Sequence, residues 1–167
     1  MDSAHEQIRN LLGRYCALMD AGDFAALAAL FADATLADEH GTVFATGAED
    51  VQRMWQAQTV LYPGSSRAEH SMNSRAEHPM NSRAEHDGTP RTRHVTANPV
   101  IDVDEHTGTA TCASSYVVFQ GTDDLPLQPI VTGRYADTFA RAEDGAWRWT
   151  QRRYALDHVG DLSHHLR

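Results

Sequence analysis

Cysteine is scarce in this sequence. Cys16 and Cys112 are the only two among 167 residues, and neither belongs to a C-x-x-C motif or to a Cys/His spacing typical of zinc ligands. Both lie in segments with periodic apolar residues, which favours two reduced thiols in the core. We therefore expect no disulfide and no metal centre built on sulfur.

Basic residues are also few. The chain has 14 Lys and Arg against 23 Asp and Glu, which gives a formal net charge of −9. A phosphate backbone or an anionic bilayer would be repelled by this field, and the only basic cluster, residues 91–94, is too short to reverse it. The composition argues against a nucleic-acid partner and against a membrane partner.

Several targeting and cofactor signals are missing. The opening residues, 1–6, show neither the basic nor the apolar region of a secretory signal, and no apolar run approaches the roughly 20 residues of a membrane span. No glycine-rich phosphate loop, dinucleotide fingerprint or metal-ligand cluster is present. We expect a cytoplasmic protein that uses no cofactor.

Helical patterns occupy the first third of the chain. Ser3 and Glu6 have the spacing of a capping box, and apolar residues then recur at helical spacing as far as a glycine stop at Gly22. Asp23 is placed to cap a second helix. A third amphipathic helix is predicted over residues 49–61, after two short strands over residues 34–39 and 42–45.

Strand patterns occupy the second half. Four long strands, joined as hairpins, are predicted over residues 93–103, 109–119, 129–141 and 146–157. Helices followed by hairpins indicate a single α+β domain over residues 1–167, with three N-terminal helices packed on one face of a curved antiparallel sheet.

An eight-residue repeat interrupts this pattern. The unit SRAEH begins at Ser66, Ser74 and Ser82, and it offers almost no apolar side chains to bury. Its period is too short for a solenoid and does not form a continuous helical stripe. We interpret residues 65–87 as an inserted surface loop whose histidines, His70, His78 and His86, are incidental rather than metal ligands.

Two residues, Asp20 and His94, suggest chemistry. Asp20 lies at the border of the apolar stripe of the first helix, near its C-terminal end, where the helix dipole disfavours an anion unless a partner compensates it. By the period of a strand, His94 shares a face with Thr96 and Asn98, and such a polar row suits the wall of a cavity better than a dry core. The Asn98–Pro99 step predicts a bulge or an edge.

These and other motifs together resemble the SnoaL-like branch of the NTF2-like superfamily. The resemblance covers the chain except for the repeat, and it is carried by the order and spacing of five groups of residues. They are Tyr15, Asp20, Gly22 and Asp23; Arg93, His94, Asn98 and Pro99; Gly133, Arg134 and Tyr135; Asp144, Gly145 and Trp147; and Arg152, Asp157, His158, Gly160 and Asp161. It implies a cone-shaped α+β barrel whose pocket opens between the helices and the sheet. Family members include dehydratases, a dehydrochlorinase, ketosteroid isomerase, polyketide cyclases and small subunits of ring-hydroxylating dioxygenases.

The resemblance also implies a site. In the dehydratase-like members, a Tyr and an Asp of the first helix and a His of the first long strand are catalytic, and Tyr15, Asp20 and His94 match those positions. The other polar positions match less cleanly, so the following residues are carried as substrate-binding candidates only: Trp55, Asn98, Tyr116, Arg134 and Arg152. Arginines in positions such as Arg134 and Arg152 more often form salt bridges or lie at a rim than bind a ligand.

The function predicted from these residues is acid–base catalysis without a cofactor. An Asp–His dyad would serve a lyase (dehydratase) or an isomerase that acts on a small, apolar, oxygenated ring compound of steroid or polyketide type. Three alternatives stay open: a non-catalytic ligand-binding domain, a dioxygenase small subunit, and hydrolase or cyclase activity. The resemblance also implies a homo-oligomer, either a dimer or a trimer.

Overall fold

The computed structural model of the protein describes residues 2–63 and 88–167. The interpretation of residues 65–87 as an inserted loop, including the three repeat histidines, falls outside the described residues. Within the described residues, no helix combines the length and the apolar character needed to cross a membrane.

The first helix forms as its capping signals predict. Helix α1 (Ala4–Ala21) begins with a complete capping box, in which the Glu6 N–H donates to the Ser3 hydroxyl and the Ser3 N–H donates to the Glu6 carboxylate at 2.9 Å. It ends at Gly22, whose φ of 74° is the left-handed conformation expected of a helix stop. The predicted apolar stripe is the face that the helix buries, and it carries Ile8, Leu12, Tyr15 and Met19.

Two shorter helices follow. Helix α2 (Phe24–Ala29) is capped by Asp23, whose carboxylate accepts a hydrogen bond from the Ala26 N–H at 3.0 Å. Helix α3 (Gly47–Gln58) starts two residues earlier than predicted and ends three residues earlier. It stops because Thr59 pairs with Leu166 of the C-terminal segment instead of continuing the helix.

Six strands form one sheet. Their bounds are β1 (Thr35–Asp38), β2 (Val43–Thr46), β3 (Thr92–Asp104), β4 (Thr109–Gln120), β5 (Gln128–Arg141) and β6 (Trp147–Val159). The order is β2-β1-β6-β5-β4-β3, so the first hairpin pairs with the last strand. All four long strands lie within two residues of their predicted bounds.

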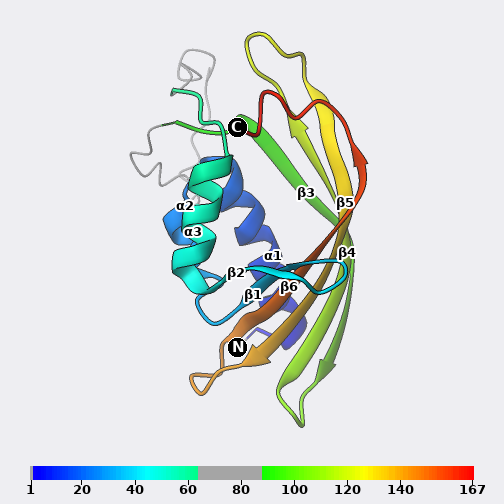
Figure 1. Ribbon diagram of the computed structural model, residues 1–167. Helices are drawn as coiled ribbons and strands as arrows, with labels where there is room; N and C mark the ends of the chain where they lie inside the picture. The colour runs from blue at the N-terminus through cyan, green and yellow to red at the C-terminus, as the bar shows by residue number, and fades with distance from the viewer. Residues whose placement is uncertain (1, 64–87) are drawn as a thin grey trace, which may run out of the picture.

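The helices cover one face of the sheet, and the other face carries no helix (Figure 1). The core lies between the two layers, where Ile8, Leu27, Phe31, Leu36 and Trp149 are fully buried. The predicted α+β class and the placement of the helices are confirmed. The sheet is open and mixed rather than wholly antiparallel, because β1 runs parallel to β6 while the other neighbours are antiparallel. A parallel pair needs a long crossover, and the whole chain between β1 and β6 provides it.

Two bulges decide which residues face the helices. In β3 one extra residue lies between Ala97 and Val100, where Asn98 has a φ of 52°. In β6 one extra residue, Thr150, lies between Trp149 and Gln151. Because side chains alternate along a strand, each extra residue moves the following side chains to the opposite face of the sheet.

Candidate functional site

The predicted dyad forms in the structure. Asp20, one residue before the end of α1, and His94, the third residue of β3, meet with Oδ1 of the carboxylate 2.7 Å from Nδ1 of the imidazole. Both side chains are buried, with 8% and 7% of their surface exposed, respectively. A short polar contact in such a dry environment is stronger than the same contact in water.

The Asp20 carboxylate has further donors. The Thr92 hydroxyl donates to Oδ1 at 2.9 Å, and the His94 backbone N–H lies 3.0 Å from both carboxylate oxygens. The exposed guanidinium of Arg93 adds an ion pair at 3.7 Å. These groups compensate an anion at the C-terminal end of a helix, where the dipole alone would disfavour it.

This arrangement fixes the imidazole. A carboxylate only accepts hydrogen bonds, so the proton of a neutral His94 ring is held on Nδ1 and the lone pair is left on Nε2. The ring is also held from the side, because Tyr15 contacts it edge-on with ring centroids 6.4 Å apart. The geometry leaves Nε2 of His94 able to accept a proton and places Asp20 where it could stabilise an imidazolium.

Tyr15 lies beside the dyad in the interior. Only 1% of its surface is exposed, and its hydroxyl lies 3.5 Å from that of Tyr154 in β6. Burial raises the pKa of the Tyr15 hydroxyl, and the nearby charge of Arg152 offsets only part of this effect. Tyr15 therefore stays protonated at neutral pH and is available as a hydrogen-bond donor.

A buried ion pair lies beneath Tyr15. The guanidinium of Arg152 donates to Asp137 of β5 through Nε at 2.7 Å and through a terminal nitrogen at 2.8 Å, and both side chains are completely buried. Its charge also lies over the rings of Tyr15 and Tyr135, at 4.2 and 4.0 Å from their centroids. Burial opposes the charge of Arg152, but the Asp137 carboxylate outweighs it and holds the pKa of the guanidinium above its usual value.

Aromatic side chains complete this part of the interior. Tyr116 of β4 stacks on Tyr135 with centroids 4.2 Å apart, and burial raises the pKa of Tyr116 to about 12. Tyr154 contacts Tyr135 edge-on at 5.3 Å. Trp55 of α3 is partly buried against the core, and its indole Nε1 has no hydrogen-bond partner among the described residues. Tyr116 and Trp55 thus lie on the helix side of the sheet with the dyad.

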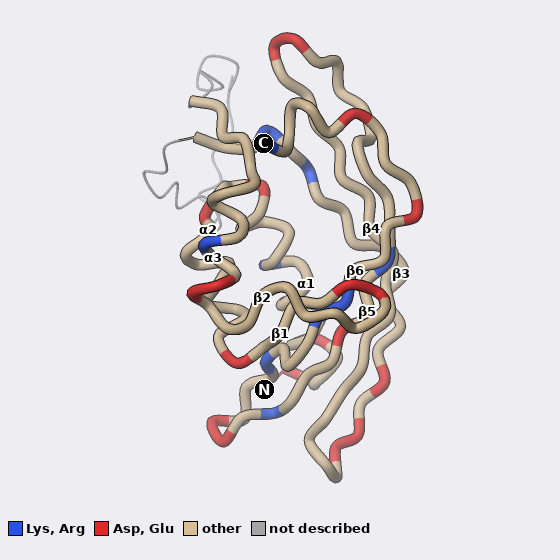
Figure 2. The backbone as a smooth tube through the Cα atoms, viewed as in Figure 1, with Lys and Arg blue, Asp and Glu red and all other residues tan. Residues whose placement is uncertain are grey.

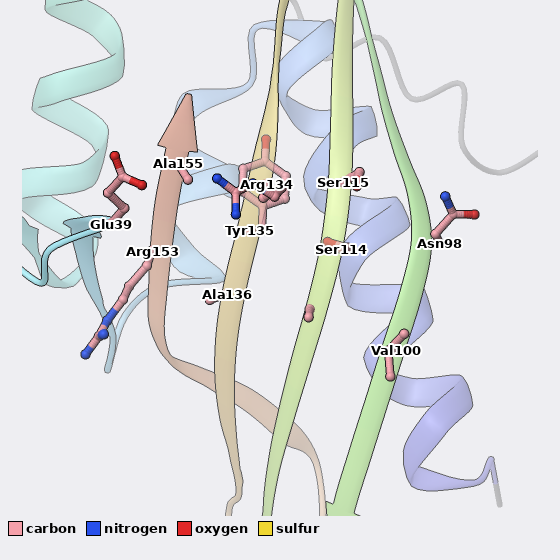
Figure 3. A pocket seen from close by; sticks show the side chains of 11 residues that line it. Glu39, Asn98, Val100, Ser114, Ser115, Arg134, Tyr135, Ala136, Arg153 and Ala155 are labelled. Carbon is pink, nitrogen blue, oxygen red and sulfur yellow. The ribbon is translucent and has the colours of Figure 1, made fainter. Parts of the chain in front are cut away.

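Two substrate-binding candidates lie elsewhere. Asn98 and Arg134 line a hollow of about 510 Å³ on the helix-free face of the sheet, together with small side chains such as Ala113, Ser115 and Ala136 (Figure 3). Asn98 leaves the face of His94 because of the bulge in β3. The side chain of Arg134 is exposed and pairs with Asp157 at 3.0 Å.

Several residues of the site were not predicted from the sequence. Thr92 shares the His94 face by strand period, which is a signal that could have identified it. Tyr154 and Asp137 gave no such signal, because their positions depend on the β6 bulge and on pairing between strands. His165, a buried residue of the C-terminal segment, lies within the electrostatic field of His94 and Asp20 and has no motif around it.

The described residues contain no group of three or more His, Cys, Asp or Glu side chains that could hold a metal ion. The polar atoms at the site are instead a carboxylate, an imidazole and phenol hydroxyls. Such a set can accept and return a proton and can donate a hydrogen bond to an oxygen.

Comparison with known families gives one match. Residues 3–153 match the SnoaL-like domain family, and no curated protein matches the sequence significantly.

Solved structures with the same fold include an NTF2-like protein with a cystatin-like fold from Novosphingobium aromaticivorans, with 24% identity over 91% of this chain and 80% of that one and a TM-score of 0.62. ActVI-ORFA from Streptomyces coelicolor is 16% identical over 94% of this chain and 100% of its own, with a TM-score of 0.64. A protein named as a candidate scytalone dehydratase, also from N. aromaticivorans, is 19% identical over 94% and 86% of the two chains, with a TM-score of 0.61. At these identities the likeness establishes the fold.

Proposed function

The chain belongs to the SnoaL-like family, and we propose that it is a cofactor-independent lyase or isomerase that acts on a small, apolar, oxygenated ring compound. The observation that carries the proposal is the buried contact of 2.7 Å between Asp20 and His94. A carboxylate and an imidazole that meet out of water, with the imidazole oriented by Nδ1, make a general base.

In the proposed reaction, Nε2 of His94 removes a proton from a carbon next to a carbonyl or an allylic centre. The imidazolium that forms is stabilised by the Asp20 carboxylate, which stays ionised. The electron pair of the broken C–H bond then moves into the ring system. Either the His94 imidazolium gives this proton to a leaving hydroxyl, which departs as water, or it returns the proton to another carbon. The first outcome is a dehydration and the second is a double-bond shift.

Tyr15 has the complementary role. Its hydroxyl is protonated because of burial, so it can donate a hydrogen bond to the oxygen on which negative charge develops. The contact with the Tyr154 hydroxyl orients it. A donor that is already in place does not have to reorganise during the reaction.

The surroundings favour an apolar ring as the substrate. Tyr15 adjoins His94, and Tyr116 and Trp55 are aromatic side chains on the same side of the sheet that are suited to pack against a flat ring. The name of one structural neighbour, a candidate scytalone dehydratase, supports a dehydration.

The first prediction tests the dyad with His94→Ala and Asp20→Asn. General base catalysis of this kind is worth about 10²–10⁴-fold, so we expect each variant to lower kcat by that factor on any hydroxylated ring substrate that the wild type converts. Asp20→Asn keeps the shape of the side chain and removes the charge that stabilises the imidazolium. Initial rates and circular dichroism, measured together, separate loss of chemistry from loss of fold.

Matched controls are available on exposed parts of β3 and its turn. His106→Ala and Asp102→Asn remove the same chemical groups from positions open to solvent, and both variants should keep wild-type rates. Full turnover in both dyad variants would contradict the mechanism. A wild-type protein that binds ring compounds without converting any of them would instead be a ligand-binding domain.

A further inference from the structure

The C-terminal segment, residues 160–167, closes one end of the interior. Its backbone is bound to the end of α3, where the Val60 N–H donates to the His165 carbonyl at 2.8 Å and the Arg167 N–H donates to the Gln58 carbonyl at 2.8 Å. The C-terminus also lies beside the start of β3 (Figure 1). The match to the SnoaL-like family covers residues 3–153, so this segment lies beyond it.

Side chains from two other parts of the chain fix the same segment. The Tyr62 hydroxyl donates to the His164 carbonyl at 2.6 Å. The fully buried amide of Gln120, at the end of β4, donates to the carbonyls of both His164 and Pro90 at 2.9 Å. The segment is thus anchored to three neighbours, and the position of His165 is set by them.

The ring of His165 is buried without a partner. Only 6% of the residue is exposed, and Nδ1 forms no hydrogen bond with any described residue. Leaving a buried polar atom unpaired is costly, and groups left in this way are often partners for a ligand or an ordered water. The segment lies near the dyad, because Gln120, which holds His164, is the register partner of Thr92, whose hydroxyl donates to Asp20.

A second unpaired atom lies on the neighbouring element. Nε1 of Trp55, in the last turn of α3, is also buried and has no partner among the described residues. That turn leads directly into the residues that pair with the C-terminal segment. Two polar ring nitrogens from adjoining elements are therefore unsatisfied at this end of the interior.

We propose that His165 is a second imidazole of the active site and that it forms a hydrogen bond to an oxygen of the ring substrate held beside His94. This inference rests on the proposed function and deepens it, because it makes the substrate a compound with an oxygen on the ring edge that faces the C-terminal segment. His165 is a substrate-binding group, whereas His94 removes the proton.

The two imidazoles have separate roles because their protonation differs. Burial lowers the pKa of His165 to about 4, so the ring is neutral at pH 7. A neutral imidazole has one donor and one acceptor nitrogen. It can hold a hydroxyl or a carbonyl group without competing with His94 for the proton that is transferred.

The second prediction uses 2-naphthol and naphthalene as a matched pair of probes, which differ only in the hydroxyl. Loss of one hydrogen bond corresponds to roughly a three- to tenfold change in Kd. His165→Leu should therefore weaken 2-naphthol by that factor and leave naphthalene within about twofold. His165→Asn, which has the same shape as Leu and retains a polar group near the position of Nδ1, should restore most of the affinity. Protein-observed NMR of the histidine ring signals measures the affinity of each probe for the wild type and for both variants.

The neighbouring His164→Asn variant is the control and should bind both probes like the wild type. The inference is overturned if His165→Leu weakens both probes equally, if it weakens neither, or if 2-naphthol leaves the His165 signals unmoved in the wild type. Loss of turnover in His94→Ala with an unaffected His165→Leu would leave the proposed function standing and overturn this inference. If His165→Leu weakens only 2-naphthol and the wild type converts no ring compound, the hydrogen bond from His165 would stand and the proposed catalysis would be contradicted.

Discussion

The charge of Arg152 is paired within the core by a bidentate contact with Asp137, and one terminal nitrogen, Nη1, has no partner among the described residues. The guanidinium also supports the rings of Tyr15 and Tyr135 from below. Arg152 therefore positions Tyr15, and whether it also contacts a substrate stays a prediction.

The third prediction concerns this pair. Arg152→Met leaves the Asp137 carboxylate buried and uncompensated, which should lower the free energy of unfolding by about 3–5 kcal/mol. The double variant Arg152→Met with Asp137→Leu removes both charges and should recover most of that loss. Urea unfolding followed by tryptophan fluorescence measures both effects.

An exposed pair provides the comparison. Arg148 and Asp144 form an ion pair in which the side chains are 50% and 58% exposed. Arg148→Met should change stability by no more than about 1 kcal/mol, because solvent screens such pairs. Equal losses in Arg148→Met and Arg152→Met would contradict the importance given to burial.

Gly133 and Gly13 differ in whether a side chain would fit at their positions. Gly133, in β5, lies opposite a bulge, and a Cβ there would approach the Ala155 carbonyl oxygen to 2.1 Å and the Tyr116 hydroxyl to 2.6 Å. Gly13, in the exposed middle of α1, has nothing within 4 Å of such an atom. The strand needs a glycine at this position, whereas the helix does not.

The fourth prediction compares the two substitutions. Gly133→Ala should destabilise the protein by about 1–3 kcal/mol, because the clash forces the β5–β6 pair and Tyr116 to move. Gly13→Ala should stabilise it by about 0.5–1 kcal/mol, because alanine has the higher helix propensity. Thermal unfolding of both variants, scanned side by side, reports the sign directly. A stabilised Gly133→Ala would show that β5 and β6 are not packed as described.

At the scale of the whole molecule, acidic positions lie in loops, near strand ends and in the first turn of α3 (Figure 2). Most described acidic side chains are exposed or half-buried, whereas the interior holds the Asp20–His94 and Asp137–Arg152 contacts. His165 is a buried group that must become charged as the protein unfolds in acid. The predicted homo-oligomer and cytoplasmic location stay predictions.

The fifth prediction follows from His165. Its pKa is about 4 in the folded protein against 6.5 as the ordinary value, so between these pH values the unfolded chain binds a proton that the folded chain does not. The free energy of unfolding should then be highest above pH 6.5 and should fall as the pH drops toward 4, by at most about 3 kcal/mol from this group.

Urea titrations at a series of pH values test this expectation. His165→Asn should flatten the acid side of the profile relative to the wild type, whereas His164→Asn should leave it unchanged. A parallel profile for wild type and His165→Asn would mean that the ring is not desolvated in the folded state.

The sequence by itself determined most of the elements and the pairing of Asp20 with His94. Local rules were sufficient for the elements, because each signal depends on neighbouring residues. These signals are the helix caps at Ser3 and Asp23, the glycine stop at Gly22 and the alternating pattern of the strands. Asp20 and His94 came from the polar residues within those patterns and from the resemblance to a family. For Asp20 and His94 to meet, α1 has only to pack on β3, and an amphipathic helix packs on a sheet through its apolar face.

Only the tertiary structure decided which other side chains join them. The extra residues in β3 and β6 turn Asn98 away from the dyad and bring Arg152 and Tyr154 toward it, and strand register depends on pairing across the sheet. His165 reaches the interior because the C-terminal segment is held by Val60, Tyr62 and Gln120. Such contacts join residues far apart in the chain, and no local pattern records them.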